Sequence, residues 1–102
     1  MDHKQYLSEE FNKKVGRNLK ACRKAWRPKV TQAQMAIELG YERQHIMRVE
    51  NGVVPATAGE VWAYGRRFHI APSLLIESSA EEITKIIKSK NVPHDIFGVP
   101  SD

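Results

Sequence analysis

Apolar residues recur every three or four positions through most of the chain, which is the spacing that places them on one side of a helix. Ser8, followed by two acidic residues, suits the opening of a first helix, and Pro28 is expected to end it. Residues 1–7 are then expected to form a mobile leader. The apolar stripe of this first helix consists of Phe11, Val15, Leu19, Cys22 and Trp26.

A second helix is predicted to begin at residue 31. Thr31 suits the N-cap, and Gln34 stands three residues later, where its side chain can complete a capping box. Val30 precedes the cap at the position from which it can pack on Met35. The start of this helix is therefore strongly specified.

A tight turn and a third helix follow. Gly40 comes after the last apolar residue of the second helix, and glycine permits the left-handed conformation that ends many helices. The third helix is expected from about residue 42 to 51. At about 100° per residue, Ile46, Val49 and Glu50 share one side of it. The opposite side carries Arg43, Gln44, Met47 and Arg48.

This second side has a chemistry that suits DNA. The major groove of B-DNA admits an α-helix, arginine can donate two hydrogen bonds to guanine, and glutamine can pair with adenine in the same way. An ordinary solvated helix face is the alternative interpretation. The turn at Gly40 and the capped helices on either side of it favour a surface that contacts base edges.

Two more helices are predicted before residue 77. Thr57 and Glu60 form another capping box, and Pro72 suits the first turn of a short helix over residues 73–76. Trp62 lies off the apolar stripe of the fourth helix, so it belongs either to the edge of the core or to a subunit interface. That stripe consists of Val61, Tyr64, Gly65 and Phe68.

The segment from residue 77 to 102 is predicted to add one helix and a tail. Ser79 and Glu82 open the helix as a third capping box. Its isoleucines either fold back on the domain or meet a second copy of the chain. The tail over residues 91–102 is either disordered or an extension that binds a partner. The isoleucines concerned are Ile83, Ile86 and Ile87, and the tail contains the pair Ile96 and Phe97.

The composition limits which fold and which location we expect for the protein. A chain of 102 residues with 41% apolar content is expected to form one domain. The net charge is +4, and eight of the sixteen basic residues fall between residues 11 and 37, where there is no acidic residue. A single cysteine cannot form an intramolecular disulfide, and Cys22 is expected in the core. With no signal peptide and no apolar run long enough for a membrane span, we expect a cytoplasmic protein that does not associate with membranes.

In addition, residues 15–76 resemble the lambda-repressor or Cro-type (XRE-like) helix-turn-helix family. The resemblance implies an all-α, five-helix DNA-binding domain over residues 8–76, with an additional C-terminal helix in 77–102. The landmarks that carry it are Thr31, Gln32, Ala36, Gly40, Ile46, Val49, Glu50, Asn51, Gly52 and Pro55.

The resemblance also implies roles for single residues. Arg43, Gln44 and Arg48 would face base edges, and Met47 would meet a thymine methyl group or pack. Gln32 would touch a phosphate, and a partly buried ion pair would join Arg23 to Glu50. The link between the first two helices and the ends of the third would contact the DNA backbone. The residues expected there are Arg27, Lys29, His45 and Asn51.

The chain departs from the family pattern at three places. Glu42 stands where serine, threonine or aspartate usually caps the recognition helix, so that helix is expected to begin less firmly. Met47 places an apolar group on the base-facing surface. The link over residues 27–30 is longer than in many relatives.

The sequence thus favours a transcriptional regulator, more specifically a repressor that binds double-stranded DNA as a homodimer. The alternative is an antitoxin-type module that captures a protein partner through residues 77–102 and also represses its own promoter. An enzyme is not expected, because the histidines lack metal-ligand spacing and no nucleophile–base pair appears. No cofactor or metal is expected either. The four histidines are His3, His45, His69 and His94.

Overall fold

The first helix, α1 (His3–Ala25), is the longest element of the computed structural model, which describes residues 3–90 and side chains from residue 8 onward. It starts earlier than Ser8, contrary to the sequence-based expectation of a leader over residues 1–7. The residues before Ser8 include no glycine and no proline, so nothing stops helical hydrogen bonding from extending through them. The helix ends three residues before Pro28.

Helices α2 (Gln32–Leu39) and α3 (Arg43–Glu50) form the predicted pair. The capping box at the start of α2 is present: the Gln34 N–H donates to Thr31 Oγ1 at 3.1 Å, and the Thr31 N–H donates to Gln34 Oε1 at 2.7 Å. Gly40 ends α2 in the left-handed region, with φ at 78°, as predicted. Glu42 caps α3 without a side-chain hydrogen bond, which agrees with the expected weaker start.

Helices α4 (Ala58–Phe68) and α5 (Pro72–Glu77) follow. The predicted capping box of Thr57 and Glu60 opens α4, and Pro72 occupies the first turn of α5. The apolar stripe of α4 is buried, whereas Trp62 remains 56% exposed. This exposure agrees with both positions considered for Trp62, the edge of the core and a subunit interface.

The last described helix, α6 (Ala80–Lys90), packs against α1. Ile83 and Ile87 are fully buried there, and Ile86 is partly buried against the same core. The isoleucine stripe thus folds back on its own domain, and it is not free to meet a second copy or a protein partner. The predicted tail, with Ile96 and Phe97, lies outside the described residues.

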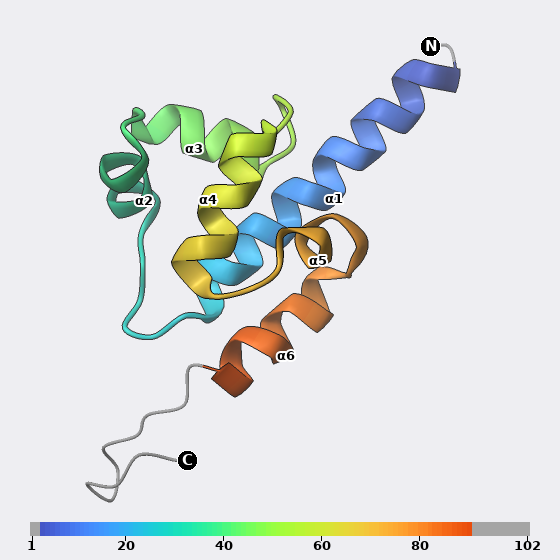
Figure 1. Cartoon of the computed structure of the whole chain (residues 1–102). Coiled ribbons are helices and arrows are strands. Elements are labelled where there is room, and N and C mark those ends of the chain that lie inside the picture. The colour runs from blue at the N-terminus through green and yellow to red at the C-terminus, as the bar shows by residue number, and fades with distance from the viewer. Residues whose placement is uncertain (1–2, 91–102) are drawn as a thin grey trace, which may run out of the picture.

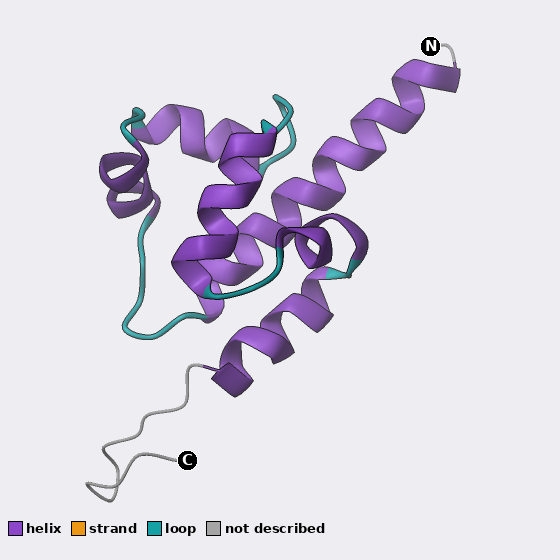
Figure 2. Cartoon of the chain, in the orientation of Figure 1, coloured by secondary structure: helices purple, strands orange, loops and turns teal. Residues whose placement is uncertain are grey.

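All the described secondary structure is helical (Figure 2). In Figure 1, α1 is a long rod with α6 beside its second half, and α2 and α3 lie at the side of the molecule away from α6. One apolar core joins all six helices of residues 3–90, and α5 contributes Leu75 to it. The most deeply buried apolar side chains of this core are Leu19, Cys22, Met35, Tyr64, Phe68, Leu75, Ile83 and Ile87.

Two residues of α1 that the sequence did not single out fix the packing around it. The Asn18 side-chain nitrogen donates to the carbonyl oxygens of Leu75 at 2.7 Å and Ser78 at 2.8 Å, so it ties α1 to the end of α5. A Cβ atom on Gly16 would lie 2.5 Å from the Val49 carbonyl oxygen. The backbone of α1 therefore contacts the end of α3 directly, which only glycine permits.

Candidate nucleic-acid interface

The outer side of α3 is open to solvent. Arg43, Gln44 and Arg48 are exposed, and Met47 between them is half-buried. We call these four residues the reading surface. On the inner side, Ile46, Val49 and Glu50 are buried, as the helical spacing predicted.

Glu50 anchors α3 to two other helices. Arg23 of α1 donates to its two carboxylate oxygens, from Nε at 2.9 Å and from Nη2 at 2.8 Å, so the ion pair implied by the resemblance is present. The Tyr64 hydroxyl of α4 donates to Oε2 at 2.9 Å. Burial, together with the nearby Glu50 carboxylate, raises the pKa of Tyr64 well above its usual range, so the hydroxyl remains a donor. The inner side of α3 is therefore fixed by charge-assisted bonds as well as by apolar packing.

Gln32 is turned toward this same carboxylate. Its side-chain nitrogen donates to Glu50 Oε1 at 3.2 Å, and the residue is half-buried. This bond supports the seat of α3. An amide nitrogen carries two hydrogens, so the expected phosphate contact of Gln32 stays a prediction.

A hollow lined by cations lies beside the start of α3, and we call it the basic hollow. Its volume is about 390 Å³, and it opens between the second half of α1, the link to α2 and the first turn of α2. Every charged residue that lines it is a lysine or an arginine, and only Arg23 among them is neutralised by an ion pair with Glu50. Helix N-termini and cations both favour anions. The lining consists of Lys20, Arg23, Lys24, Lys29, Thr31, Gln32, Ala33 and Arg43.

The basic hollow adds two residues to the candidate site that the sequence analysis did not assign. Lys20 and Lys24 lie one turn apart on α1, within the basic run between residues 11 and 37. Their i, i+4 spacing is the signal that could have placed them on one face of the helix. Lys29 lines the hollow as expected for a residue of the link.

Arg27, by contrast, does not line the hollow. Its Nη1 donates to the carbonyl oxygens of Lys24 at 2.7 Å and Trp26 at 2.8 Å, at the end of α1. The guanidinium thereby satisfies carbonyl groups that the helix leaves without partners. The structure therefore gives Arg27 a capping role, and its expected contact with the DNA backbone stays a prediction.

The two remaining candidates lie at different parts of α3. Asn51 is exposed at the C-cap, next to Gly52, where it was expected to approach the DNA backbone. His45 was expected near a phosphate, but its Nε2 lies 2.7 Å from Glu60 Oε2 of α4. One of its two imidazole nitrogens thus faces a carboxylate, and the expected phosphate contact of His45 stays a prediction.

Glu60 is held firmly in that position. Burial alone would raise the pKa of its carboxyl, but hydrogen bonds from His45, from the Thr57 N–H and from Tyr41 together lower it below the ordinary value. The charge and hydrogen bond of Glu60 raise the pKa of Tyr41 in turn. The carboxylate is therefore retained at neutral pH as a fixed acceptor between α3 and α4.

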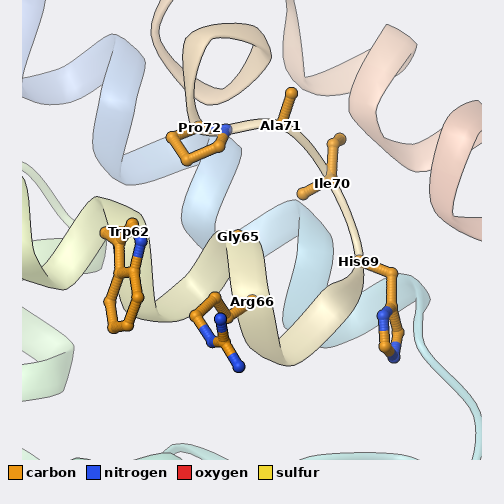
Figure 3. Close-up of a pocket in the computed structure, with 7 residues that line it drawn as sticks. All are labelled: Trp62, Gly65, Arg66, His69, Ile70, Ala71 and Pro72. Atoms are coloured by element: carbon orange, nitrogen blue, oxygen red, sulfur yellow. The ribbon is translucent and has the colours of Figure 1, made fainter.

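The other hollows of the described residues lie along α4. Figure 3 shows one of about 440 Å³, in which the Arg66 guanidinium lies 5.1 Å from the Trp62 ring centre and His69 stands at the end of the helix. A second groove, which we call the apolar groove, shares Trp62 and Pro72 with it and also has a volume of about 440 Å³. Its exposed apolar side chains are Phe11 at 49%, Trp62 at 56% and Ile76 at 37% exposure.

None of the helices in the described part of the chain is both long enough and apolar enough to cross a membrane. Within the same residues, no three histidine, cysteine, aspartate or glutamate side chains are grouped so as to hold a metal ion. Comparison of the chain with protein-family models, with curated proteins and with solved structures gave no match. The geometry of the chain itself is therefore the basis for any functional assignment.

Proposed function

We propose that this protein is a sequence-specific DNA-binding transcriptional regulator, more specifically a repressor, with a lambda-repressor-like helix-turn-helix formed by α2 and α3. One observation carries the proposal. Arg43, Gln44 and Arg48 stand exposed on one side of a helix whose other side is fixed by Glu50 and by apolar packing. A side chain that reads a base edge must be presented on a rigid support, because bidentate hydrogen bonds tolerate little misplacement.

The chemistry of the reading surface suits base edges in the major groove. Arg43 and Arg48 can each donate two hydrogen bonds to the O6 and N7 atoms of guanine, and Gln44 can pair with the N6 and N7 atoms of adenine. Met47 lies between them and offers an apolar contact for a thymine methyl group. An RNA duplex is a poorer target, because its major groove is deep and narrow.

The basic hollow would supply the contacts to phosphate. Lys20, Lys24 and Lys29 lie next to Arg43 around this hollow, so a backbone that passes the start of α3 would meet several cations. Such contacts give affinity and fix the orientation of the protein, but they carry no sequence information. A sequence-specific binder needs both base contacts, which α3 would make, and phosphate contacts, which the basic hollow would make.

We further propose that two copies of the chain bind a pseudo-palindromic operator. Reading helices related by a two-fold axis should reach major grooves about 34 Å apart, and therefore half-sites about ten base pairs apart. Because α6 is packed on α1, its isoleucines do not provide the contact. The apolar groove remains, with Phe11, Trp62 and Ile76 exposed around it, as the surface for the second copy.

Selection of bound duplexes from a random pool tests the proposal, because it examines binding, symmetry and spacing together. We expect a selected sequence with two related half-sites. Arg43→Ala and Arg48→Ala should each weaken binding to that sequence by about 1–3 kcal/mol and relax the preference at one base position. Lys29→Ala should weaken all sequences alike.

Titration of each variant against the selected duplex and a scrambled duplex measures both effects. An equal loss on both duplexes for Arg43→Ala would contradict its assignment as a base-reading residue. A chain that selects no duplex would contradict the function as a whole.

A further inference from the structure

His45 stands at the boundary between the outer and inner sides of α3. Its side chain is 38% exposed, and its Nε2 lies 2.7 Å from Oε2 of Glu60, whose side chain is only 5% exposed. On a helix, residue 45 is three positions before Arg48, which places the two side chains on neighbouring parts of the surface. The contact therefore joins the edge of the reading surface to α4.

The acceptor of this contact does not move freely. Glu60 Oε1 accepts a hydrogen bond from the Thr57 N–H at 2.8 Å, and the Glu60 N–H donates to Thr57 Oγ1 at 3.1 Å. The carboxylate is thus held by the capping box of α4, with its second oxygen directed at His45. Because the Glu60 carboxylate is fixed on α4, its hydrogen bond with His45 also fixes the position of α3 relative to α4.

The imidazole ring is restrained on a second side as well. The Tyr41 ring lies 4.4 Å from the His45 ring, centre to centre, and is tilted by 33°. Tyr41 belongs to the turn before α3, where Glu42 supplies no side-chain cap. The His45 contacts therefore support the part of α3 that lacks a cap of its own, while Glu50 holds the opposite end.

We propose that His45 is a positioning residue, which sets the sequence discrimination of α3 by fixing this helix to Glu60 of α4. This inference rests on the function proposed above. A small rotation of α3 would misdirect Arg48 and Gln44 at base edges, whereas phosphate contacts around the basic hollow would tolerate it. Loss of the His45–Glu60 contact should therefore reduce binding to the preferred sequence and leave non-specific binding intact.

The experiment compares the full chain and four variants on the duplex selected from the random pool and on a scrambled duplex, at several salt concentrations. The variants are His45→Ala, Glu60→Ala, the double variant and His45→Gln. We expect each single alanine variant to lose about 10-fold in affinity for the selected duplex, the worth of one hydrogen bond to a charged group. The double variant should lose no more than Glu60→Ala alone, because Glu60→Ala already removes the His45–Glu60 contact.

Two matched variants separate this role from its alternatives. Thr57→Ala also breaks the capping box of α4 but keeps the carboxylate, so it should retain the affinity that Glu60→Ala loses. His45→Gln places an amide nitrogen near the position of Nε2 and should recover most of the loss. Affinity for the scrambled duplex and the slope of log affinity against log salt should be the same for all variants.

Three results would each overturn the inference about His45 without contradicting the proposed function. An equal loss on both duplexes for His45→Ala, with a salt slope reduced by about one, would mean that His45 contacts a phosphate. Unchanged binding by His45→Ala would mean that the contact positions nothing, and equal effects of Glu60→Ala and Thr57→Ala would assign the effect to the cap of α4. Failure of the wild-type chain to select any duplex would instead overturn the proposed function, and this inference with it.

Discussion

Glu50 is a fully buried carboxylate that holds three side chains. It accepts hydrogen bonds from Arg23, Gln32 and Tyr64, which come from three different helices. An unpaired charge in such a place would be costly, and a paired one contributes little net stability while strongly specifying the arrangement around it. No buried side-chain nitrogen or oxygen of the described residues lacks a hydrogen-bond partner. The polar interior of the molecule therefore specifies where α3 sits.

Because of Glu60, we expect the free energy of unfolding to depend on pH in the acidic range. Its carboxyl has an ordinary pKa of 4.5 and a lower value in the folded protein. The stabilisation that the Glu60 carboxylate gives the folded protein is thus fully present above about pH 4.5. It is lost as the pH falls through the pKa that Glu60 has in the folded protein. We expect the free energy of unfolding to decrease below pH 4.5, and Glu60→Gln to reduce that dependence.

Urea denaturation between pH 6 and pH 3 measures this slope for both proteins. The Glu82 pKa is also lowered, chiefly by hydrogen bonds from Ser79, so Glu82→Gln should likewise reduce the pH dependence and gives the comparison for an exposed cap. An identical pH dependence in wild type and Glu60→Gln would contradict the prediction.

Cys22 is expected to be chemically inert in the folded protein. Burial raises the pKa of this thiol to about 12, so at pH 8 only about one thiol in 10⁴ is ionised. A thiol-specific reagent should therefore modify Cys22 only as fast as the protein unfolds. The reaction is followed by absorbance with and without denaturant, and rapid labelling of the native protein would show that the core around α1 is open.

At the scale of the elements, the packing of α1 on α3 depends on the absence of a side chain at Gly16. A methyl group there would lie 2.5 Å from the Val49 carbonyl oxygen and 2.7 Å from that of Glu50, both in the backbone. Gly16→Ala should therefore destabilise the fold by about 1–3 kcal/mol, although alanine is the better helix former.

Gly59→Ala provides the matched control, because a Cβ atom there meets nothing closer than Thr57 Oγ1 at 3.8 Å. That substitution should leave stability unchanged or raise it by up to about 1 kcal/mol. Chemical denaturation measures both variants. Equal stability of Gly16→Ala and wild type would mean that α1 and α3 are not in the close contact described here.

The elements that could be predicted from sequence are those with local signals. The capping boxes at Thr31 and Thr57 and the glycine at residue 40 fixed helix ends through bonds within a few residues, and these ends are found in the structure. The predicted start of α1 was wrong because Ser8 and the acidic residues after it suit both the opening and the interior of a helix. A cap signal is decisive only where something also stops the helix from continuing.

Within the candidate site, the side of α3 that faces solvent could be predicted, but the partners of individual side chains could not. Helical spacing separates Arg43 from Ile46 without any knowledge of the neighbours. His45 pairs with Glu60, and Gln32 pairs with Glu50. Both pairs form only through the packing of α2, α3 and α4. Long-range pairing of this kind leaves no periodic trace in the sequence.

At the scale of the whole molecule, the charged and apolar surfaces are separate. The basic hollow lies around the start of α2, and the apolar groove lies between α1, α4 and α5. We therefore expect a homodimer, joined at the apolar groove, with both reading surfaces free. Standard interfaces bury about 800 Å² on each partner, so the three exposed apolar side chains would form only the centre of the contact.

Trp62→Glu tests this arrangement, because a charge at the centre of an apolar contact should prevent it. Sedimentation equilibrium should show a dimer for wild type and a monomer for the variant, at least tenfold weaker in association. Ile37→Glu is the control, since Ile37 is 81% exposed on α2 and does not line the groove. Equal dimerisation of wild type and Trp62→Glu would exclude the groove as the interface.

The packing of α6 on α1 also bears on how the protein is made. Helix α1 leaves the ribosome before the other described helices and α6 leaves it after them, yet Ile83 and Ile87 complete the core along α1. A nascent chain that already contains both α2 and α3 therefore still has a water-exposed apolar strip on its first helix. A premature stop codon before residue 80 would consequently yield an aggregation-prone product, open to proteases and chaperones, rather than a shorter working protein.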